Sequence, residues 1–370
     1  MRVGVPKEIK DHEDRVGLVP SSVAELVRHG HEVLIQTGAG VGAGLEDDLY
    51  IAAGGRIVPS ADEIFRDAEM VVKVKEPLSP ERKKLRPGQV LFTYLHLAPD
   101  REQTQELLKS GVTGIAYETV TSPIGTLPLL TPMSEIAGRL APQVGARYLE
   151  RTSGGRGVLL GGVPGVPPAD VVVLGGGVSG THAATIAIGM GAIVTVVDRS
   201  AEVLRRIAVQ LPAARTIFST HDALVQVVRR ADLLIGAVLV PGAAAPKLIT
   251  RDMVKTMKSG SVLVDIAIDQ GGCSETSKPT SHSEPVYVVD GVTHFCVTNM
   301  PGAVARTSTF ALNNATLPFV LALADKGWRR AIVEDPHLRN GLNVHAGKLT
   351  CKPVAEAQGL TYTAPEQLAA

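Results

Sequence analysis

The stretch PADVVVLGGGVSGTHAATIAIGMGAIVTVVD, residues 168–198, decides the fold of this chain. It contains an apolar run at 171–174 that is typical of a buried parallel strand. Gly175, Gly177 and Gly180 follow in GxGxxG spacing, and a second apolar run at 193–197 ends at Asp198. A strand, a glycine turn, a helix and a second strand that ends in an acid predict a dinucleotide-binding βαβ unit.

Each residue of this motif has a physical task. Gly175 permits the tight turn, Gly177 lets the backbone approach a pyrophosphate, and Gly180 lets the helix pack close to the strand. The N–H groups at the start of the helix attract the phosphates. Asp198 can accept hydrogen bonds from the adenosine ribose and would repel a 2′-phosphate, so the motif predicts NAD rather than NADP. Glycine is common here, at 38 of 370 residues, so the alternative is a chance glycine-rich turn.

The composition narrows the class of protein. A length of 370 residues favours two domains, and Lys+Arg and Asp+Glu balance at 37 each. We therefore expect neither nucleic acid nor a membrane surface as a partner. The charged N-terminal segment is unlike a secretory signal, no apolar run approaches the ~18 residues of a membrane span, and the three cysteines lack a CxxC pair. These features predict a cytoplasmic protein with buried, reduced thiols.

The chain on both sides of the motif alternates strands and helices. In the first 130 residues we expect strands at 33–36, 70–74, 90–94 and 113–116 and helices at 21–29, 61–66 and 101–109. A helix should start with Thr131 as its N-cap and reach about residue 150, and a glycine- and proline-rich loop separates it from the motif. Further strands are expected at 233–238, 262–266 and 294–297, followed by a long helix at 303–327.

This pattern predicts an α/β protein with two Rossmann-like, doubly wound domains. The dinucleotide-binding domain, residues 131–305, should be inserted into a discontinuous substrate domain made of residues 1–130 and 306–370. The long helix that follows residue 303 does not fit the alternation of the inserted domain, so we assign it to the first domain.

Three places in the first domain carry side chains suited to holding a substrate or moving a proton. Arg15 lies in a short turn and can grip a carboxylate through two parallel hydrogen bonds, or can be a solvated surface residue. Lys73 and Lys75 follow an apolar strand, where they can meet a ligand or protect a sheet edge. His96 follows Tyr94 at the end of another strand and can be an acid/base group or a structural histidine.

The second domain offers two carboxylates and a turn. Asp269 comes just after a predicted strand and is the better candidate to face the nicotinamide. Asp265 falls inside the strand, where a buried carboxylate needs structural hydrogen bonds. Asn299 and Met300 form a turn after another strand and should line the same crevice, so we expect them, with Tyr94, to contact the substrate.

Ten segments in this order resemble the alanine dehydrogenase family along nearly the whole chain. They are GVPKEIK, DRVGLVP, VVKVKEP, TYLHLA, LTPMSEIAGR, GGRGVLLGGVPGV, GGGVSG, ADLLIGAVLVPG, VDIAIDQGG and VTNMPGAVARTST. The resemblance implies a cytoplasmic homohexamer that uses NAD to oxidise L-alanine to pyruvate and ammonia and also catalyses the reverse reductive amination.

The resemblance also implies roles for individual residues. Arg15 and Lys75 hold the substrate carboxylate and carbonyl, and His96 and Asp269 act as acid/base groups. The implied cofactor contacts are Gly175, Gly177, Gly180, Ser134, Val178, Asp198, Ser219, Val238, Leu239, Lys278, Ile266, Ala267, Ile268, Asp269, Val297, Thr298, Asn299 and Met300.

Two further expectations come from this comparison of motifs. The magnesium site claimed for some relatives has no clear second ligand here, because Lys326 is near the place of a histidine, so we predict no metal. The NAD-binding subunit of proton-translocating transhydrogenase is the alternative function. It has no need of Arg15, Lys75 and His96 together, and their joint presence favours a dehydrogenase.

Overall fold

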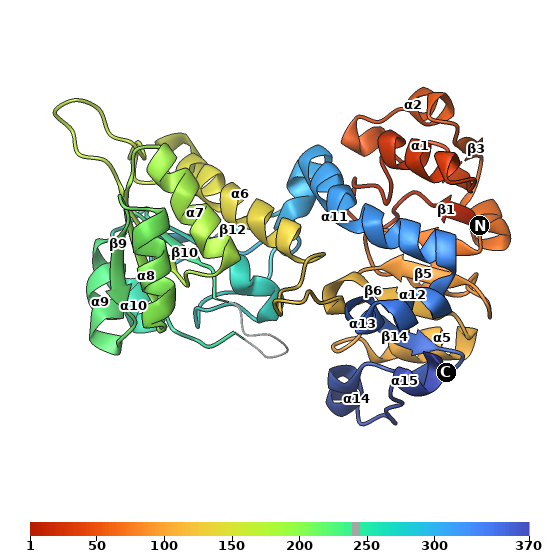
Figure 1. Ribbon diagram of the computed structural model, residues 1–370. Coiled ribbons are helices and arrows are strands. Elements are labelled where there is room, and N and C mark those ends of the chain that lie inside the picture. The colour runs from red at the N-terminus through yellow and green to blue at the C-terminus, as the bar shows by residue number, and fades with distance from the viewer. Residues whose placement is uncertain (239–244, 370) are drawn as a thin grey trace. The chain divides into compact units, whose positions relative to one another are not determined.

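The computed structural model describes residues 1–238 and 245–369, which form two compact units (Figure 1). Unit 1 consists of Met1–Met133 and Val304–Ala370, and unit 2 is the intervening Ser134–Ala303. Each unit is built around its own mainly parallel sheet, with helices on its faces. The predicted α/β class is therefore confirmed.

The described part of unit 1 holds an eight-stranded sheet in the order β15-β14-β6-β5-β4-β1-β2-β3. Its strands are β1 (Arg2–Val5), β2 (Glu32–Gln36), β3 (Arg56–Val58), β4 (Met70–Val72), β5 (Val90–Thr93), β6 (Thr113–Ala116), β14 (Leu342–His345) and β15 (Lys348–Leu349). Strands β1 to β6 pair in parallel, whereas β14 and β15 are antiparallel. The strand order reverses between β1 and β4, and ligands of open α/β sheets bind outside the carboxyl ends at such a reversal.

Helices cover this sheet. They are α1 (Pro20–Arg28), α2 (Asp47–Ala52), α3 (Ala61–Asp67), α4 (Ser79–Arg82), α5 (Arg101–Ser110), α11 (Ala305–Lys326), α12 (Trp328–Glu334), α13 (Pro336–Arg339), α14 (Lys352–Gln358) and α15 (Glu366–Ala369), with short 3-10 turns η1 (Val41–Ala43) and η2 (Tyr117–Thr119). One core cluster joins Val71 and Leu91 of the sheet to Phe65 of α3, Leu107 of α5 and Val354 of α14. These side chains are nearly inaccessible to water, so their burial stabilises the strands that end at the candidate site.

The described part of unit 2 holds a seven-stranded sheet in the order β12-β13-β11-β10-β7-β8-β9. Its strands are β7 (Asp170–Leu174), β8 (Ile193–Asp198), β9 (Arg215–Phe218), β10 (Leu233–Gly236), β11 (Val262–Asp265), β12 (Val286–Val289) and β13 (Val292–Phe295), and only β12 among them pairs antiparallel. Its helices are α6 (Thr131–Leu149), α7 (Val178–Gly189), α8 (Ala201–Gln210), α9 (His221–Arg230) and α10 (Arg251–Thr256), and its short turns are η3 (Arg151–Ser153), η4 (Ile266–Gln270) and η5 (Met300–Val304).

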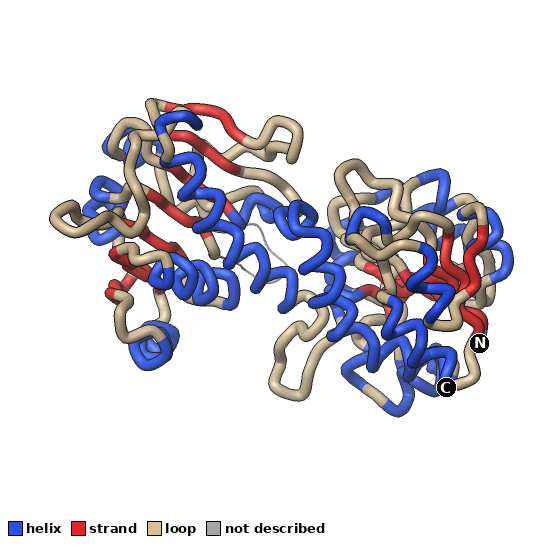
Figure 2. Tube along the Cα trace, turned by 90° about the horizontal axis from the view of Figure 1, so that it is seen from above, coloured by secondary structure: helices blue, strands red, loops and turns tan. Residues whose placement is uncertain are grey.

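Helices α6 and α7 lie side by side (Figure 1), and Gly138 of α6 leaves room for this close packing, while Gly145 lets α6 approach strand β10. A Cβ on Gly138 would lie 2.2 Å from the carbonyl oxygen of Ser179, and a Cβ on Gly145 would lie 2.5 Å from the Leu233 side chain. Apolar side chains of α9 and α10 pack on Val172, Leu234 and other strand residues in a second cluster. Figure 2 shows helices and loops on either side of the strands of this unit.

Several local predictions need correction. Thr131 is the first residue of α6, not an N-cap outside it, because a turn at 128–130 delivers the chain into the helix and the Thr131 hydroxyl donates to Leu127 O at 2.9 Å. Strand β4 ends at Val72 and β5 at Thr93, earlier than predicted. Four strands, β1, β3, β9 and β12, were not predicted, and three of them lie at a sheet edge. A weak strand and a helix were expected within the last ~45 residues, where the structure has β14, β15 and α14. Within residues 1–238 and 245–369, no helix is long and apolar enough to cross a membrane.

Candidate active site

The glycine turn between β7 and α7 has the geometry that a pyrophosphate requires. Gly175 has φ +95°, a left-handed conformation that favours glycine. A Cβ on Gly180 would lie 1.8 Å from Gly175 O, so the helix touches the turn only because this residue has no side chain. A Cβ on Gly177 would meet no atom within 4 Å, so its open side can admit a ligand at the N-terminus of α7. The residues present therefore fit a dinucleotide.

Asp198 ends β8 and reaches back to this turn. Its Oδ2 accepts a hydrogen bond from Gly176 N at 2.7 Å, and its Oδ1 accepts one from Ser200 N at 2.8 Å. A carboxylate oxygen has two lone pairs, so each oxygen can also accept from a ribose hydroxyl. The acid thus supports the turn and keeps the capacity to accept further hydrogen bonds.

Arg206 of α8 is a cofactor-site candidate that the sequence analysis missed. Its Nη2 donates to Gly176 O at 2.5 Å, and the Thr181 hydroxyl donates to the same oxygen at 3.1 Å. The spacing of residues along helix α8 could have identified Arg206 from the sequence. A Cβ on Gly176 would lie 2.6 Å from the Val203 side chain, and Arg206, three residues after Val203, is its neighbour on the helix surface. The Gly176 peptide is therefore held at its N–H by Asp198 and at its carbonyl by Arg206.

The carboxyl end of β11 carries the two acids considered above. Asp265 is fully buried and accepts hydrogen bonds from Ala267 N at 3.1 Å, Cys273 N at 2.8 Å and Ser277 Oγ at 2.5 Å. Its predicted structural role is confirmed. Asp269 lies in η4 and is exposed, so its carboxylate is accessible to a ligand.

The other predicted cofactor contacts of unit 2 are spread over several strand ends. Asn299 has φ +58°, and its carbonyl oxygen lies 3.2 Å from His282 Nε2. Of the remaining residues, Ala267, Ile268, Val297 and Met300 are buried, Ser134, Ser219, Val238, Ile266 and Thr298 are half-buried, and Val178 and Lys278 are exposed. Leu239 lies outside the described residues. No interaction in the structure tests these contacts individually, so they remain predictions.

Arg15 in unit 1 is buried, so the alternative of a solvated surface arginine is wrong. Its side chain is 1% exposed and pairs in a bidentate way with Glu13, through Nε at 2.6 Å and Nη2 at 2.5 Å. Burial opposes the charge, but the hydrogen bonds that Arg15 donates to Glu13 and the negative charge of Glu13 outweigh burial and raise the pKa of Arg15. Nη1 faces Met133, whose sulfur lies 3.0 Å away.

The loop that carries Arg15 is anchored to helix α11. Asn313 donates through Nδ2 to Gly17 O at 2.6 Å and accepts from Val19 N at 3.2 Å. A Cβ on Gly17 would lie 2.5 Å from Val72 O, so the loop also passes directly over the end of β4. The glycine at this position therefore permits a close approach between the loop and the sheet.

Lys73 and Lys75 have different environments, although the alternation of a strand predicts one shared face. The strand ends at Val72, and Lys73 is fully buried between Glu8 at 3.0 Å and Glu81 at 2.6 Å. Burial disfavours its charge, but the two carboxylates outweigh burial and raise the pKa of Lys73. Strand β4 is interior to the sheet, so the alternative of an edge-protecting lysine is also wrong.

Lys75 is half-buried and emerges where the same buried carboxylate holds the backbone. Glu8 Oε1 accepts from Val74 N at 2.7 Å and from Lys75 N at 3.4 Å. On the other side, the Thr93 hydroxyl donates to Lys75 O at 2.9 Å. The Lys73 cluster thus orders the segment from which Lys75 extends.

His96 lies three residues beyond β5 in a left-handed conformation, with φ +48°. Its backbone N–H donates to Glu118 Oε1 at 2.6 Å, and its ring stacks on the Tyr94 ring with centroids 5.6 Å apart. Its Nδ1 lies 3.5 Å from Glu76 Oε2, and its side chain is 44% exposed. The histidine is therefore held in place but open to solvent.

Tyr94 and Glu76 on either side of this imidazole have contrasting acidities. Tyr94 is buried and donates to Leu129 O at 2.5 Å, and burial raises the pKa of its phenol well above the ordinary value. Burial would raise the pKa of Glu76, but His96, Lys75 and Lys10 together outweigh it and hold that pKa far below the ordinary value. Glu76 is therefore an anion and Tyr94 a neutral hydroxyl at neutral pH.

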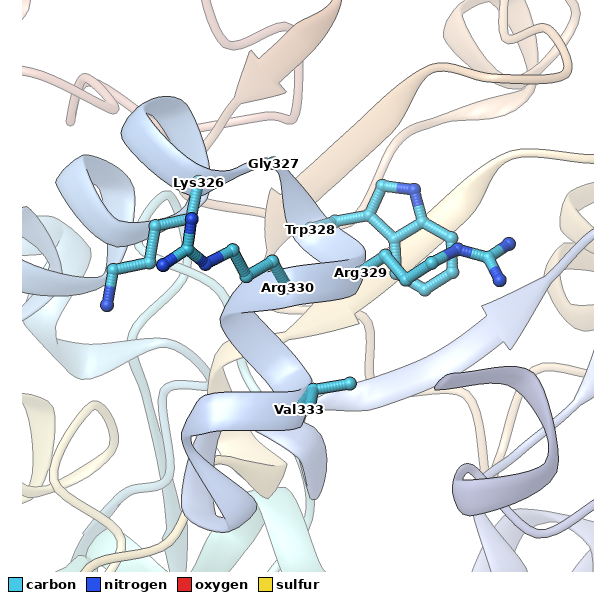
Figure 3. A pocket seen from close by; sticks show the side chains of 6 residues that line it. All are labelled: Lys326, Gly327, Trp328, Arg329, Arg330 and Val333. Atoms are coloured by element: carbon cyan, nitrogen blue, oxygen red, sulfur yellow. The ribbon is translucent and has the colours of Figure 1, made fainter. Parts of the chain in front are cut away.

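An open depression at the junction of α11 and α12 is separate from these residues (Figure 3). The described lining residues are Lys326, Gly327, Trp328, Arg329, Arg330 and Val333, none of which is a predicted site residue. Lys326 and Arg330 both pair with Glu334, at 2.7 and 2.6 Å, and Arg329 lies 5.1 Å over the Trp328 ring. The cations are engaged with neighbours, so we assign no ligand to this depression.

Two family models match the chain across both units. The model described as alanine dehydrogenase/PNT, N-terminal domain, matches residues 4–137, and the corresponding C-terminal domain model matches residues 141–352. The chain belongs to the alanine dehydrogenase/PNT family. Membership confirms the resemblance recognised from the ten segments.

Individual members of the alanine dehydrogenase/PNT family are similar to nearly the whole chain. A protein named alanine dehydrogenase from Halomonas elongata is 61% identical over 363 residues, which is 98% of each chain. A solved structure titled L-alanine dehydrogenase has a TM-score of 0.95 at 54% identity, covering 97% of this chain and 99% of that chain. This likeness confirms the two Rossmann-like domains. A solved transhydrogenase from Sinorhizobium meliloti has a TM-score of 0.81 at 26% identity, covering 94% and 98%.

Proposed function

We propose that this protein is an NAD-dependent L-alanine dehydrogenase that interconverts L-alanine with pyruvate and ammonia. The observation that carries the proposal is 61% identity over 98% of both chains to a protein named alanine dehydrogenase. The geometry of the glycine turn and of Asp198 supports NAD as the cofactor.

In this proposal one domain binds the cofactor and the other binds the substrate. Residues 131–305 hold NAD, which supplies a hydride acceptor when bound, and residues 1–130 with 306–370 hold the substrate. Gly177 and the N-terminus of α7 receive the pyrophosphate, and Asp198 receives the ribose. The other predicted contacts, from Ser134 to Met300, complete the cofactor site.

Charged groups of unit 1 position the substrate. Lys75 presents an ammonium from a segment ordered by Glu8, and Arg15 presents a guanidinium from a loop anchored to α11. We assign the carboxylate and carbonyl of the substrate to these two residues, with Tyr94, Asn299 and Met300 as further contacts. Such positioning brings C2 to the hydride acceptor, which is the proximity contribution to catalysis.

Proton transfers accompany the loss of hydride from C2 of alanine. Hydride loss leaves an iminium, water adds to its carbon, and ammonia departs as pyruvate forms. We assign His96 to take the proton from the attacking water and to return a proton to the departing nitrogen, with Asp269 as the second acid/base group. The exposed face of His96 and the exposed Asp269 carboxylate support these assignments.

We further propose that the protein acts in the cytoplasm as a homohexamer, with small-molecule substrates and no metal. Resemblance to the family carries the oligomeric state. Analytical ultracentrifugation of the purified chain measures it directly, and a monomer or dimer would contradict the proposal.

The alternative is a transhydrogenase NAD-binding subunit, and the similarity to the Sinorhizobium meliloti structure supports the shared fold. A screen of purified protein against amino acids and 2-oxo acids with NAD and NADP decides between them. The dehydrogenase should reduce NAD in the presence of L-alanine and oxidise NADH in the presence of pyruvate and ammonia. NAD binding without turnover of any small substrate would overturn the proposal.

A further inference from the structure

We propose that Glu76 is a positioning residue that fixes the orientation and the charge of the His96 imidazole, and that Lys10 moderates this effect. Only the predicted effect on turnover rests on the proposed function. The contact between the two side chains can be tested without it.

The first observation is the place of Glu76 in the fold. It follows β4 while His96 follows the neighbouring strand β5, so parallel pairing brings the two segments to the same edge of the sheet. The Glu76 side chain is 15% exposed, and its Oε2 lies 3.5 Å from His96 Nδ1. This separation is an ion-pair distance that a small rotation of either side chain would convert to a hydrogen bond.

The second observation is that the other contacts of His96 leave Nδ1 to Glu76. Tyr94 stacks on the face of the ring, and Glu118 accepts the backbone N–H rather than a ring nitrogen. An Nδ1–H directed at a carboxylate holds the neutral imidazole in the tautomer whose Nε2 is the acceptor. Nε2 is then the atom that exchanges a proton with the substrate or water.

Charged side chains lie around the ring. Glu76 and Glu118 contribute negative charge from the segment after β4 and from η2. Lys10 contributes positive charge where it pairs with the other carboxylate oxygen of Glu76, and the charge of Lys75 also lowers the pKa of Glu76. Tyr94 stays neutral. Glu76 is the acid that faces the ring itself, and Lys10, which forms an ion pair with Glu76, offsets part of its effect.

Carbethoxylation of His96 tests the contact directly. Diethyl pyrocarbonate reacts with the neutral imidazole, and site-resolved mass spectrometry separates His96 from the other nine histidines of the full chain. In Glu76→Gln the midpoint of the reaction against pH should move about one unit lower, because an opposite charge nearby is removed. In Lys10→Gln it should move higher. Glu102→Gln, an exposed carboxylate on α5, is the matched control and should leave it unchanged.

Turnover provides the second readout. Glu76→Gln should lower kcat about tenfold with the KM for alanine changed less than about threefold, since the tautomer and not binding is disturbed. An unmoved midpoint in both Glu76→Gln and Lys10→Gln would overturn the inference. If Glu76→Gln does not fold, Lys10→Gln alone decides. Activity retained in His96→Ala would instead overturn the proposed role of His96, while the labelling midpoints would still report the contact.

Discussion

The glycine turn of unit 2 and the polar strand ends of unit 1 are built by different means. In the turn, the feature that we propose for binding is backbone shape, and the acid that supports it is close in sequence: Gly176 N donates to Asp198, 22 positions away. At the strand ends of unit 1, the features that we propose for binding are charged side chains, and the cluster that supports Lys75 joins distant segments: Lys73 donates to Glu8, 65 positions away. Shape encoded by glycine spacing is local, whereas charge pairing depends on how the chain folds.

The largest effect should come from unit 1, at His96. In His96→Ala, kcat should fall roughly 10²–10⁴-fold, the usual contribution of a general acid/base group. NAD binding measured by calorimetry should stay within about twofold, because His96 belongs to the unit without the glycine turn. His221→Ala, an exposed histidine of α9, is the control. More than about a third of the wild-type rate in His96→Ala would remove the residue from its proposed role.

The next largest effect should be the loss of stability when a buried ion pair of unit 1 is broken. Lys73→Met leaves Glu8 and Glu81 buried without their cation, and breaking such a pair costs about 3–5 kcal/mol. Lys84→Met is the matched control, because its partner Asp62 is 73% exposed and surface pairs contribute about 0–1 kcal/mol. The urea midpoint of unfolding measures both. Equal midpoints for the two variants would show that the buried cluster is not required for stability.

In unit 2 the corresponding test adds a side chain to the glycine turn instead of removing a charge. Gly180→Ala places a Cβ 1.8 Å from Gly175 O, so the turn must shift. We expect a loss of about 1–3 kcal/mol in stability and at least a tenfold weaker affinity for NAD. Gly189→Ala on the same helix has open space and should be neutral or slightly stabilising. NAD affinity in Gly180→Ala equal to that of Gly189→Ala would contradict the assigned turn.

Asp198 both supports the glycine turn and carries the negative charge that is expected to repel a 2′-phosphate. Two variants separate these two effects. Asp198→Gly should weaken NAD use and improve NADP use, each by roughly tenfold, because a 2′-phosphate no longer meets a like charge. Asp198→Asn removes the charge but keeps an oxygen for Gly176 N or Ser200 N, and it should disturb NAD less. Ratios of kcat/KM for the two cofactors give the measurement. Equal use of both by the wild-type enzyme would refute the role of Asp198.

The smallest expected effect is in acid stability. Burial opposes ionisation of Glu76, but His96, Lys75 and Lys10 hold its folded pKa below the ordinary value of about 4.3. Its contribution to stability is therefore present above about pH 4.3 and is lost as the pH falls through the folded pKa. The difference in urea midpoint between wild type and Glu76→Gln should shrink as the pH falls below about 4, where the carboxylate of Glu76 becomes protonated. A difference that widens in acid would reverse the assigned direction.

The sequence by itself determined the α/β class and the dinucleotide turn. Apolar strands, glycines with special conformations and an acid at a strand end are signals carried by neighbouring residues, so they can be recognised without knowing the rest of the fold. Sequence alone also selected Arg15, Lys75 and His96 as candidates, because each follows a strand or turn at a predictable edge.

Only the tertiary structure decided what surrounds these candidates. It buried Arg15 against Glu13, separated Lys73 from Lys75, placed Arg206 beside the Gly176 carbonyl and brought Glu76 to His96. Glu13 lies two positions from Arg15 in the chain, but the partners of Lys73, Gly176 and His96 come from other elements of the fold, and local periodicity does not reveal the order of strands in a sheet. For that reason the orientation of these three groups depends on the assembled sheet, whereas the pairing of Arg15 also depends on its neighbour in the chain.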